Sequence, residues 1–287
     1  MEFRHFCDAD YDAVCDFLIA LNEPDRQHIN WNWARFEWMY EHPEFDKSLR
    51  ETIGLWIDGG RVVGAAIYDM YFGEAFVGVL PDYAALYPEA LAYAYDALKD
   101  DAGLAIAIND DNRAEIAAAE AAGFVQIEQT ETLLKRETDD AIRVKLPDDL
   151  HFGALDPVRD ATAIAWLFWQ GFDHGDDRAE FECEDATVPQ VRKHFRPELG
   201  VAALKADGEP VACCLVWVHP NTDYAYVEPV CTIPAYRGKG VGKAVVLEAL
   251  RRAQALGAKS AYVISDQVFY EKLGFVPDSH YTFYRKA

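Results

Sequence analysis

Cys231-Thr232-Ile233-Pro234-Ala235-Tyr236-Arg237-Gly238-Lys239-Gly240-Val241-Gly242 is a stretch that joins an apolar strand to an amphipathic helix through a glycine-rich turn. Three glycines in five positions let the backbone turn tightly and direct its N–H groups toward an anion, and the helix adds its positive end. We expect the helix to end at Gly257. Its predicted buried face consists of Val241, Ala244, Val245, Leu247, Ala249, Leu250 and Ala253. Residues 237–242 are therefore predicted to form a cradle for a pyrophosphate.

Two common phosphate-binding motifs do not fit this turn. The mononucleotide P-loop ends in Gly-Lys-Ser/Thr, whereas the segment from Gly238 onward ends in Gly-Lys-Ala and has no hydroxyl for magnesium. The dinucleotide fingerprint is Gly-x-Gly-x-x-Gly, whereas this turn reads Gly-x-Gly-x-Gly and has no downstream acidic partner for a ribose. From the residues alone, a plain strand-to-helix turn remains the alternative.

The turn resembles the Arg/Gln-x-x-Gly-x-Gly/Ala motif of the GNAT family of N-acetyltransferases, with Arg237, Gly240 and Gly242 at the motif positions. The preceding Val230-Cys231-Thr232-Ile233-Pro234 is similar to the strand and proline that lead into that motif. Further along the chain, Phe269-Tyr270-Glu271-Lys272-Leu273-Gly274-Phe275 is similar to the family's Leu-Tyr-Glu-Lys-Leu-Gly-Phe helix end. The resemblance covers residues 200 to 287.

The resemblance implies acetyl-CoA as cosubstrate, without a metal. In this family the strand before the cradle and the strand after its helix splay apart, and the pantetheine arm lies between them. Predicted strands at 200–205, 210–219, 224–232, 260–264 and 281–284 follow the family order. The cofactor-binding residues that the resemblance implies are Val230, Cys231, Thr232, Arg237, Gly238, Lys239, Gly240, Val241, Gly242 and Lys243.

Transfer to an amine requires a group that removes a proton, because a free amine with a pKa near 10 is protonated at neutral pH. Glu228 stands four residues before Thr232 on the predicted central strand, where several members of the family carry a base. A partly buried carboxylate with apolar neighbours can have the raised pKa that a base requires. A structural role, in which Glu228 pairs with a nearby cation, remains the alternative.

Tyr270 occupies the tyrosine position of the family's Tyr-x-x-x-Gly-Phe pattern, which implies that its hydroxyl protonates the departing thiolate. A core aromatic is the alternative role, although the adjacent Phe269 is better placed for packing. Cys231 suggests a second route through an acyl-cysteine. Because no histidine lies near it in the local sequence to activate the thiol, we expect direct transfer instead.

An internal repeat predicts two similar halves. Residues 53–63 read as strand, Asp-Gly-Gly turn and strand, and residues 201–211 repeat this pattern, while residues 121–125 recur as 272–276. The predicted fold class is α/β, with two tandem GNAT-like (acyl-CoA N-acyltransferase) domains, each a mixed, mostly antiparallel sheet flanked by helices. The expected domains are 1–138 (degenerate), a linker at 139–149, and 150–287 (catalytic).

The first half lacks the groups that would bind CoA. Aligning Pro81 with Pro234 puts Ala84, Tyr87 and Glu89 at the positions of Arg237, Gly240 and Gly242, so no glycine remains and a carboxylate is expected where phosphate oxygens would lie. Tyr270 aligns with Ala119, which has no hydroxyl. We therefore expect no CoA in this half.

Two aromatic segments lie where the family places the helices that line the acceptor groove, at 29–40 and 166–172, and helical spacing predicts that both are mainly core. The second precedes an acidic run, 173–185, which is either a solvated surface or an anionic rim for a cationic substrate.

The net charge of −22 disfavours nucleic acid as a partner and suits either solubility or the attraction of a cationic amine. No leader and no run of 18 apolar residues is present, so we expect a cytoplasmic protein that does not enter membranes. The six cysteines show no Cys-x-x-Cys or metal-ligand spacing, so reduced thiols and no metal site are expected.

The sequence as a whole predicts an N-acetyltransferase that moves acetyl from acetyl-CoA directly to a primary amine, expected to be that of a small molecule. The sequence leaves open whether the protein forms a homodimer. Two alternatives remain: a non-catalytic acyl-CoA-binding sensor or interaction module, and an N-acyltransferase that uses a longer acyl-CoA.

Overall fold

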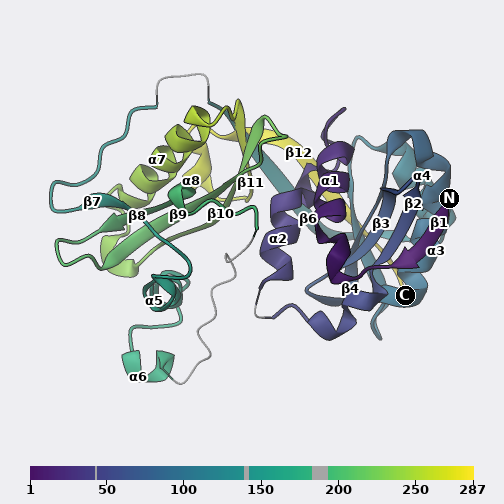
Figure 1. Ribbon diagram of the computed structural model, residues 1–287, viewed down its shortest axis with the longest axis horizontal. Helices are drawn as coiled ribbons and strands as arrows, with labels where there is room; N and C mark the ends of the chain where they lie inside the picture. Colours follow the sequence, from purple (N-terminus) through teal and green to yellow (C-terminus); the bar gives the residue numbers. More distant parts are fainter. Residues whose placement is uncertain (43, 139–141, 183–192) are drawn as a thin grey trace. The chain divides into compact units, whose positions relative to one another are not determined.

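The computed structural model describes residues 1–42, 44–138, 142–182 and 193–287 (Figure 1). It divides into two compact units. Unit 1 comprises Met1–Leu133 together with Pro277–Ala287, and unit 2 comprises Leu134–Val276. Each unit contains one mixed sheet flanked by helices, which confirms the predicted tandem α/β fold class.

Unit 1 has the strand order β1-β2-β3-β4-β5-β12-β6. These strands are β1 (Glu2–His5), β2 (Gly54–Asp58), β3 (Arg61–Asp69), β4 (Tyr71–Val79), β5 (Leu104–Asn109), β12 (Val276–Lys286) and β6 (Val125–Glu137), whose last residues belong to unit 2. Its helices are α1 (Tyr11–Leu21), α2 (Trp33–Tyr40), α3 (Tyr87–Leu98) and α4 (Arg113–Ala121), with short 3-10 turns at Asp8–Asp10, Ile29–Trp31, Lys47–Thr52 and Pro81–Leu86.

Unit 2 continues from the end of β6 in the order β11-β10-β9-β8-β7. These strands are β7 (His151–Ala154), β8 (Gly200–Leu204), β9 (Pro210–Val218), β10 (Tyr224–Thr232) and β11 (Ser260–Ile264). The helices are α5 (Ala161–Gly171), α6 (Arg178–Phe181), α7 (Val241–Ala255) and α8 (Val268–Glu271), with 3-10 turns at Pro197–Leu199 and Pro234–Tyr236. Within this unit, α7 and α5 pack on opposite sides of β9 and β10 (Figure 1).

The two units repeat the same local geometry, as the sequence predicts. β2 and β3 form one hairpin, and β8 and β9 form its counterpart. Leu80 and Ile233, the residues before the two aligned prolines, have the same backbone angles, φ −61° and ψ 148°. Gly123 and Gly274 both adopt positive φ, at 89° and 86°, a conformation that glycine reaches without steric cost.

The last strand differs from the prediction. The short strand expected at 281–284 is longer, β12, and it pairs antiparallel with β5 through six registered residues, from Tyr281 opposite Asn109 to Lys286 opposite Leu104. Residues Pro277–Ala287 therefore group with unit 1 rather than with the C-terminal half. The cause is strand pairing, because the strand supplies main-chain partners to a neighbour far away in the sequence.

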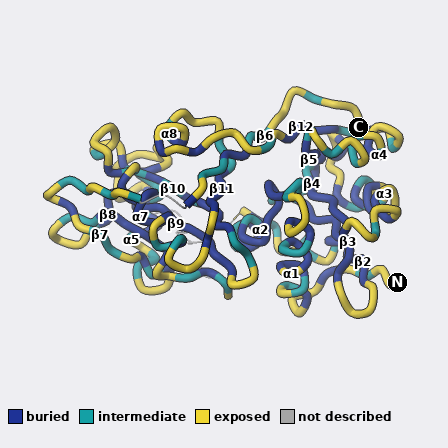
Figure 2. The backbone as a smooth tube through the Cα atoms, turned by 90° about the horizontal axis from the view of Figure 1, so that it is seen from above, coloured by how far each residue is buried: buried dark blue, intermediate teal, exposed yellow. Residues whose placement is uncertain are grey.

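Both cores are apolar and centre on the strands (Figure 2). Every predicted buried position of α7 is buried, and so are most large side chains of the aromatic segment at 29–40. The segment at 166–172 is less buried than predicted. Trp166, Phe168 and Trp169 are only half-buried, and Phe172 is 49% exposed, because α5 lies on β9 and β10 with one face only.

The five cysteines within the described residues are free thiols. Cys213 and Cys231 are registered neighbours on β9 and β10, and their sulfurs lie 3.7 Å apart. Burial and this contact raise the pKa of Cys213 well above its usual value, with the hydrogen bond to Cys231 as the largest cause. No helix in the described part of the chain is long and apolar enough to cross a membrane.

Candidate active site

The candidate site forms where β10 and β11 separate. The two strands pair in parallel only from Tyr224 to Tyr226, and the register of β10 against β9 shifts between Val227 and Val230. Beyond this bulge, β10 has no strand partner on the β11 side among the described residues, which is the splay that the resemblance implies. A pocket of about 690 Å³, called here the unit 2 pocket, lies beside Val230, Cys231 and Thr232.

The cradle at residues 237–242 has the conformation that its glycines predict. Gly238 and Gly240 have φ of 72° and 81°, and a Cβ added at either would meet nothing within 4 Å, so both face open space. A Cβ on Gly242 would lie 2.9 Å from the Thr232 Oγ1, so this glycine lets the helix start close to β10. Gly240 is the N-cap of α7 and no side chain caps the helix. Its first N–H groups therefore remain for an anion, and the site fits the pyrophosphate of CoA.

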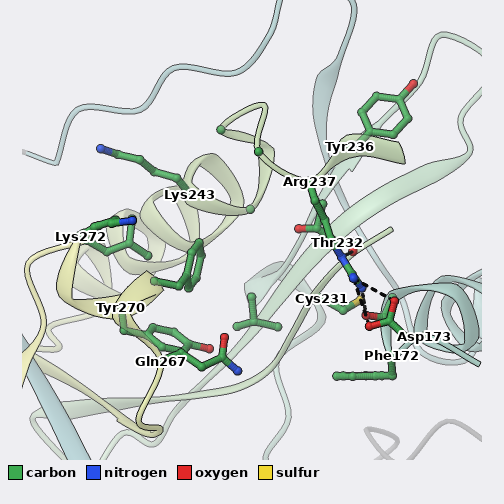
Figure 3. Close-up of a pocket in the computed structure, with 17 residues that line it drawn as sticks. Phe172, Asp173, Cys231, Thr232, Tyr236, Arg237, Lys243, Gln267, Tyr270 and Lys272 are labelled. Carbon is green, nitrogen blue, oxygen red and sulfur yellow. Dashed lines mark hydrogen bonds and ion pairs between the residues drawn. The ribbon is translucent and has the colours of Figure 1, made fainter. Parts of the chain in front are cut away.

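Two lysines add positive charge to this pocket. Lys243 lies in the first turn of α7 and Lys272 directly follows α8, and both line the unit 2 pocket. In Figure 3 they lie together on the side of the pocket opposite Arg237. Lys272 was not among the predicted binding residues, although it lies within the Tyr-Glu-Lys segment that carries the resemblance.

The Arg237 side chain forms part of the wall of the unit 2 pocket. Its Nη1 lies 2.9 Å from the Asp173 Oδ1, its Nη2 donates to the Gly171 carbonyl at 2.8 Å, and its Nε donates to the Thr232 carbonyl at 3.0 Å (Figure 3). These contacts join the end of α5 to the end of β10. The guanidinium thus holds the pocket wall, while the cradle itself presents main-chain groups.

Tyr270 extends from α8 with its hydroxyl toward the middle of the unit 2 pocket (Figure 3). It is buried, and its ring lies against Phe269 and Phe275. Burial raises the pKa of Tyr270 strongly, and the neighbouring Cys214 and Glu228 raise it further. The phenol therefore keeps its proton well above neutral pH, and it is a weaker acid than a free tyrosine.

Glu228 lies on the bulge of β10 and is half-buried. Its Oε2 accepts a hydrogen bond from the Tyr226 hydroxyl at 2.7 Å, and its main-chain carbonyl accepts one from the Trp217 Nε1 at 2.8 Å. It is not among the residues that line the unit 2 pocket. Tyr226 and Glu228 stand two residues apart on β10, so strand alternation puts both side chains on the same face.

Cys231 lines the unit 2 pocket and is buried against α5. A Cβ on Gly171 would lie 2.7 Å from the Cys231 Cβ, so the glycine at the end of α5 permits this close approach. Phe172 and Asp173, which follow Gly171, also line the pocket. Phe172 ends the predicted aromatic segment, and Asp173 begins the predicted acidic run, whose residues 183–185 lie outside the described part of the chain.

Eight of the ten predicted cofactor-binding residues line the unit 2 pocket: Val230, Cys231, Thr232, Arg237, Gly238, Gly240, Gly242 and Lys243. The other two lie elsewhere. Lys239 places its Nζ 5.1 Å from the centre of the Tyr236 ring, and the Val241 side chain is fully buried in the core. Only their main-chain groups belong to the cradle segment.

Unit 1 has no corresponding cradle. The turn after Leu80 is 3-10 helical over Pro81–Leu86 and continues directly into α3, and no residue from Leu80 to Glu89 has positive φ. The prediction that the Glu89 carboxylate lies where phosphate oxygens would bind is wrong. The Glu89 Oε1 instead accepts a hydrogen bond from the Trp56 Nε1 at 2.8 Å. A largely buried indole N–H requires such an acceptor. Ala119, at the position of Tyr270, is fully buried.

Known proteins resemble this chain both in sequence and in fold. Residues 161–275 match the model of the acetyltransferase (GNAT) family. The chain is 28% identical over 141 residues to the mycothiol acetyltransferase of Paenarthrobacter aurescens (strain TC1), and this alignment spans 46% of the chain and 44% of the relative. The chain thus matches less than half of that relative's length.

Two solved structures match nearly the whole chain, each at 16% identity, which is evidence for the fold alone. A tandem GNAT protein from the clavulanic acid biosynthesis pathway has a TM-score of 0.62 over 99% of this chain and 98% of its own. A GCN5-related N-acetyltransferase from Sphaerobacter thermophilus has a TM-score of 0.57 over 99% and 95%. Residues 161–275 therefore form a domain that matches the acetyltransferase (GNAT) family.

Proposed function

We propose that unit 2 transfers the acetyl group of acetyl-CoA directly to the primary amine of a small molecule. The observation that carries the proposal is the unit 2 pocket, which combines an open glycine cradle, two lysines and the Tyr270 hydroxyl in one cavity of about 690 Å³. Acetyl-CoA supplies an acetyl group activated as a thioester. The residues of the chain bind it, position it and move protons.

The cradle would hold the pyrophosphate through the main-chain N–H groups at the start of α7. Lys243 and Lys272 offer charge for phosphate oxygens on that side of the pocket. The main-chain groups of Val230 and Thr232, next to the point where β10 and β11 part, would pair with the pantetheine arm. Most of this binding depends on the backbone, so it is sensitive to glycine replacement and tolerant of side-chain truncation.

The proposed reaction needs two proton transfers. The carboxylate of Glu228 takes one proton from the amine, whose lone pair then forms the new C–N bond. As the C–S bond breaks, the electron pair goes to sulfur and the Tyr270 hydroxyl gives it a proton. The position of the Tyr270 hydroxyl, which points toward the middle of the unit 2 pocket, supports this assignment. Glu228, outside the pocket lining, would act through a water molecule or at the amine's entry side.

Direct transfer is favoured over an acyl-cysteine route. Cys231 lies at the pocket wall, but its sulfur is 3.7 Å from the Cys213 sulfur and within 3.8 Å of the Leu167 carbonyl. Neither neighbour is a base that would activate a thiol. Phe172 and Asp173 offer an apolar surface and a carboxylate at the same wall, which suits an organic amine. The relative named for mycothiol, a small molecule, supports a small acceptor.

A thiol-release assay tests the proposal. The purified chain is mixed with acetyl-CoA and a panel of primary amines, and free CoA is measured against time, with Tyr270→Phe as the matched variant. Amine-dependent release by the parent chain, reduced in the variant, is expected. Tight CoA binding without release for any amine would favour the sensor instead, and faster release from a longer acyl-CoA would assign a different acyl donor.

A further inference from the structure

Glu228 is held at two points, one on its side chain and one on its main chain. The Tyr226 hydroxyl donates a hydrogen bond to the Glu228 Oε2 at 2.7 Å, and the Trp217 Nε1 donates one to the Glu228 carbonyl oxygen at 2.8 Å. A glutamate side chain without such contacts samples many rotamers, and ordering it costs conformational entropy. The two hydrogen bonds therefore order this residue before a substrate binds.

Tyr226 is itself a rigid donor. It lies on β10, opposite Trp217 on β9 and Tyr262 on β11, and all three side chains are fully buried. Close packing of such large rings in the interior leaves the Tyr226 ring little room to turn. The centre of the unit 2 sheet thus sets the position of the Tyr226 hydroxyl, and the hydroxyl in turn sets the position of the Glu228 carboxylate.

Glu228 stands close to the chemistry of unit 2 although it does not line the pocket. It follows Val227 at the bulge of β10, two residues before Val230, which does line the pocket. Burial and Cys214 are the larger causes of the raised pKa of Tyr270, and the charge of Glu228 is the third. The carboxylate and the phenol are therefore near enough for their charges to interact.

We propose that Tyr226 is a positioning residue, which holds the Glu228 carboxylate in the orientation from which it takes the proton of the amine. The inference rests on the proposed function, in which Glu228 is the base. Proton transfer to a base requires hydrogen-bond geometry, and a small misplacement of a reacting group has a large effect on rate. Tyr226 is not among the described residues that line the pocket, and its hydroxyl keeps its own proton throughout.

A purely structural role for Tyr226 makes a different prediction. Buried tyrosine hydroxyls usually require a hydrogen-bond acceptor, which the Glu228 carboxylate provides. If that were the whole role, Tyr226→Phe would lower the stability of the fold and leave the turnover of the folded enzyme unchanged. A positioning role instead lowers kcat, and it leaves acetyl-CoA affinity unchanged because that affinity depends on the cradle.

A double-mutant cycle on the full chain separates the two roles. The acceptor is the amine, among benzylamine, ethanolamine and putrescine, from which the parent chain gives the fastest release of CoA at pH 7. We expect Tyr226→Phe to lower kcat about tenfold and to leave acetyl-CoA affinity, measured by calorimetry, unchanged. In the Glu228→Gln background the same substitution should cost nothing further, since no base remains to be oriented.

Tyr68→Phe is the matched control. Tyr68 is a fully buried tyrosine on β3 of unit 1, and its hydroxyl donates to the Asp46 carbonyl at 2.6 Å, so its loss measures the cost of removing such a hydroxyl from the core. It should lower the melting temperature and leave kcat unchanged.

Two results would overturn the inference and leave the proposed function intact. One is an equal loss of kcat from Tyr226→Phe in both backgrounds, which would separate its effect from Glu228. The other is a parent-like kcat in Tyr226→Phe together with a clear loss in Glu228→Gln. A parent-like kcat in Glu228→Gln, or no release of CoA from any of the three amines, would instead reject the proposed base or the proposed reaction, and the inference with it.

Discussion

The Arg237 guanidinium and the Asp173 carboxylate form an ion pair at the wall of the unit 2 pocket, with Nη1 and Oδ1 2.9 Å apart. Both side chains are substantially exposed, at 43% and 64%, so the pair itself adds little stability. The ion pair matters because it holds the Arg237 side chain, the one arginine of the motif, at the pocket wall. The main chain of residues 237–242 then remains as the anion-binding surface.

Gly240→Asp should abolish CoA binding. The residue has φ of 81° and faces open space, so an aspartate there would be strained and would place a negative charge against the pyrophosphate. Arg237→Ala should only weaken binding, because the guanidinium already contacts Asp173, Gly171 and Thr232. Isothermal titration with CoA measures both. Gly208→Asp is the matched control, since Gly208 has φ of 88° and equally open surroundings in the β8–β9 turn, away from the pocket. Parent-like affinity in Gly240→Asp would place the CoA site elsewhere.

Tyr270→Phe should lower kcat by about 10²-fold or more and leave acetyl-CoA affinity nearly intact, because a positioned acid contributes about 10²–10⁴-fold. The ring is packed between Phe269 and Phe275, so phenylalanine preserves the core. Tyr236→Phe removes another hydroxyl from the same pocket and should have little effect. Steady-state kinetics separates the two variants, and an unchanged kcat in Tyr270→Phe would reduce the tyrosine to a packing role.

Glu228→Gln should cost most activity at low pH, with a loss that shrinks as the pH rises. At low pH the amine is protonated and needs a base, whereas near its pKa of about 10 the free amine no longer does. The glutamine still accepts the hydrogen bond from Tyr226, so the strand geometry is preserved. A pH profile of kcat/KM from 6 to 10 checks this, and a loss of equal size at every pH would remove Glu228 as the base.

The chain should bind one equivalent of CoA. Tyr87 stands where unit 2 has Gly240, and Ala119 stands where it has Tyr270. The pocket of unit 1 beside Val79 is lined by no lysine among the described residues. Titration of the full chain should therefore saturate at a single site, which Gly240→Asp removes. A second equivalent that survives this substitution would contradict the degeneracy of unit 1.

A fragment of residues 145 to 287 should aggregate. It carries β12 without β5, its six-residue partner in unit 1, and it lacks the end of β6, which neighbours β11. Unpaired strand edges are sites of aggregation. Size-exclusion chromatography of the fragment, against the full chain, measures this. A soluble and fully active fragment would show that the pairing of β12 with β5 is not needed for stability.

The sequence alone predicted the parts of this protein that depend on local chemistry. Glycine spacing implied the positive φ values of the cradle, alternation and helical periodicity located β8 to β11 and the buried face of α7, and the repeat revealed two similar halves. These features depend on residues close together in the chain, whose preferred backbone angles and burial follow from their side chains.

Tertiary structure alone decided the rest. It placed β12 with unit 1, paired the Glu89 carboxylate with the Trp56 indole, and paired Arg237 with Asp173. It also brought His28 and Glu115, 87 residues apart, into one pocket wall. The physical reason is that such contacts depend on strand register and on the packing of distant segments, which no local pattern of residues encodes.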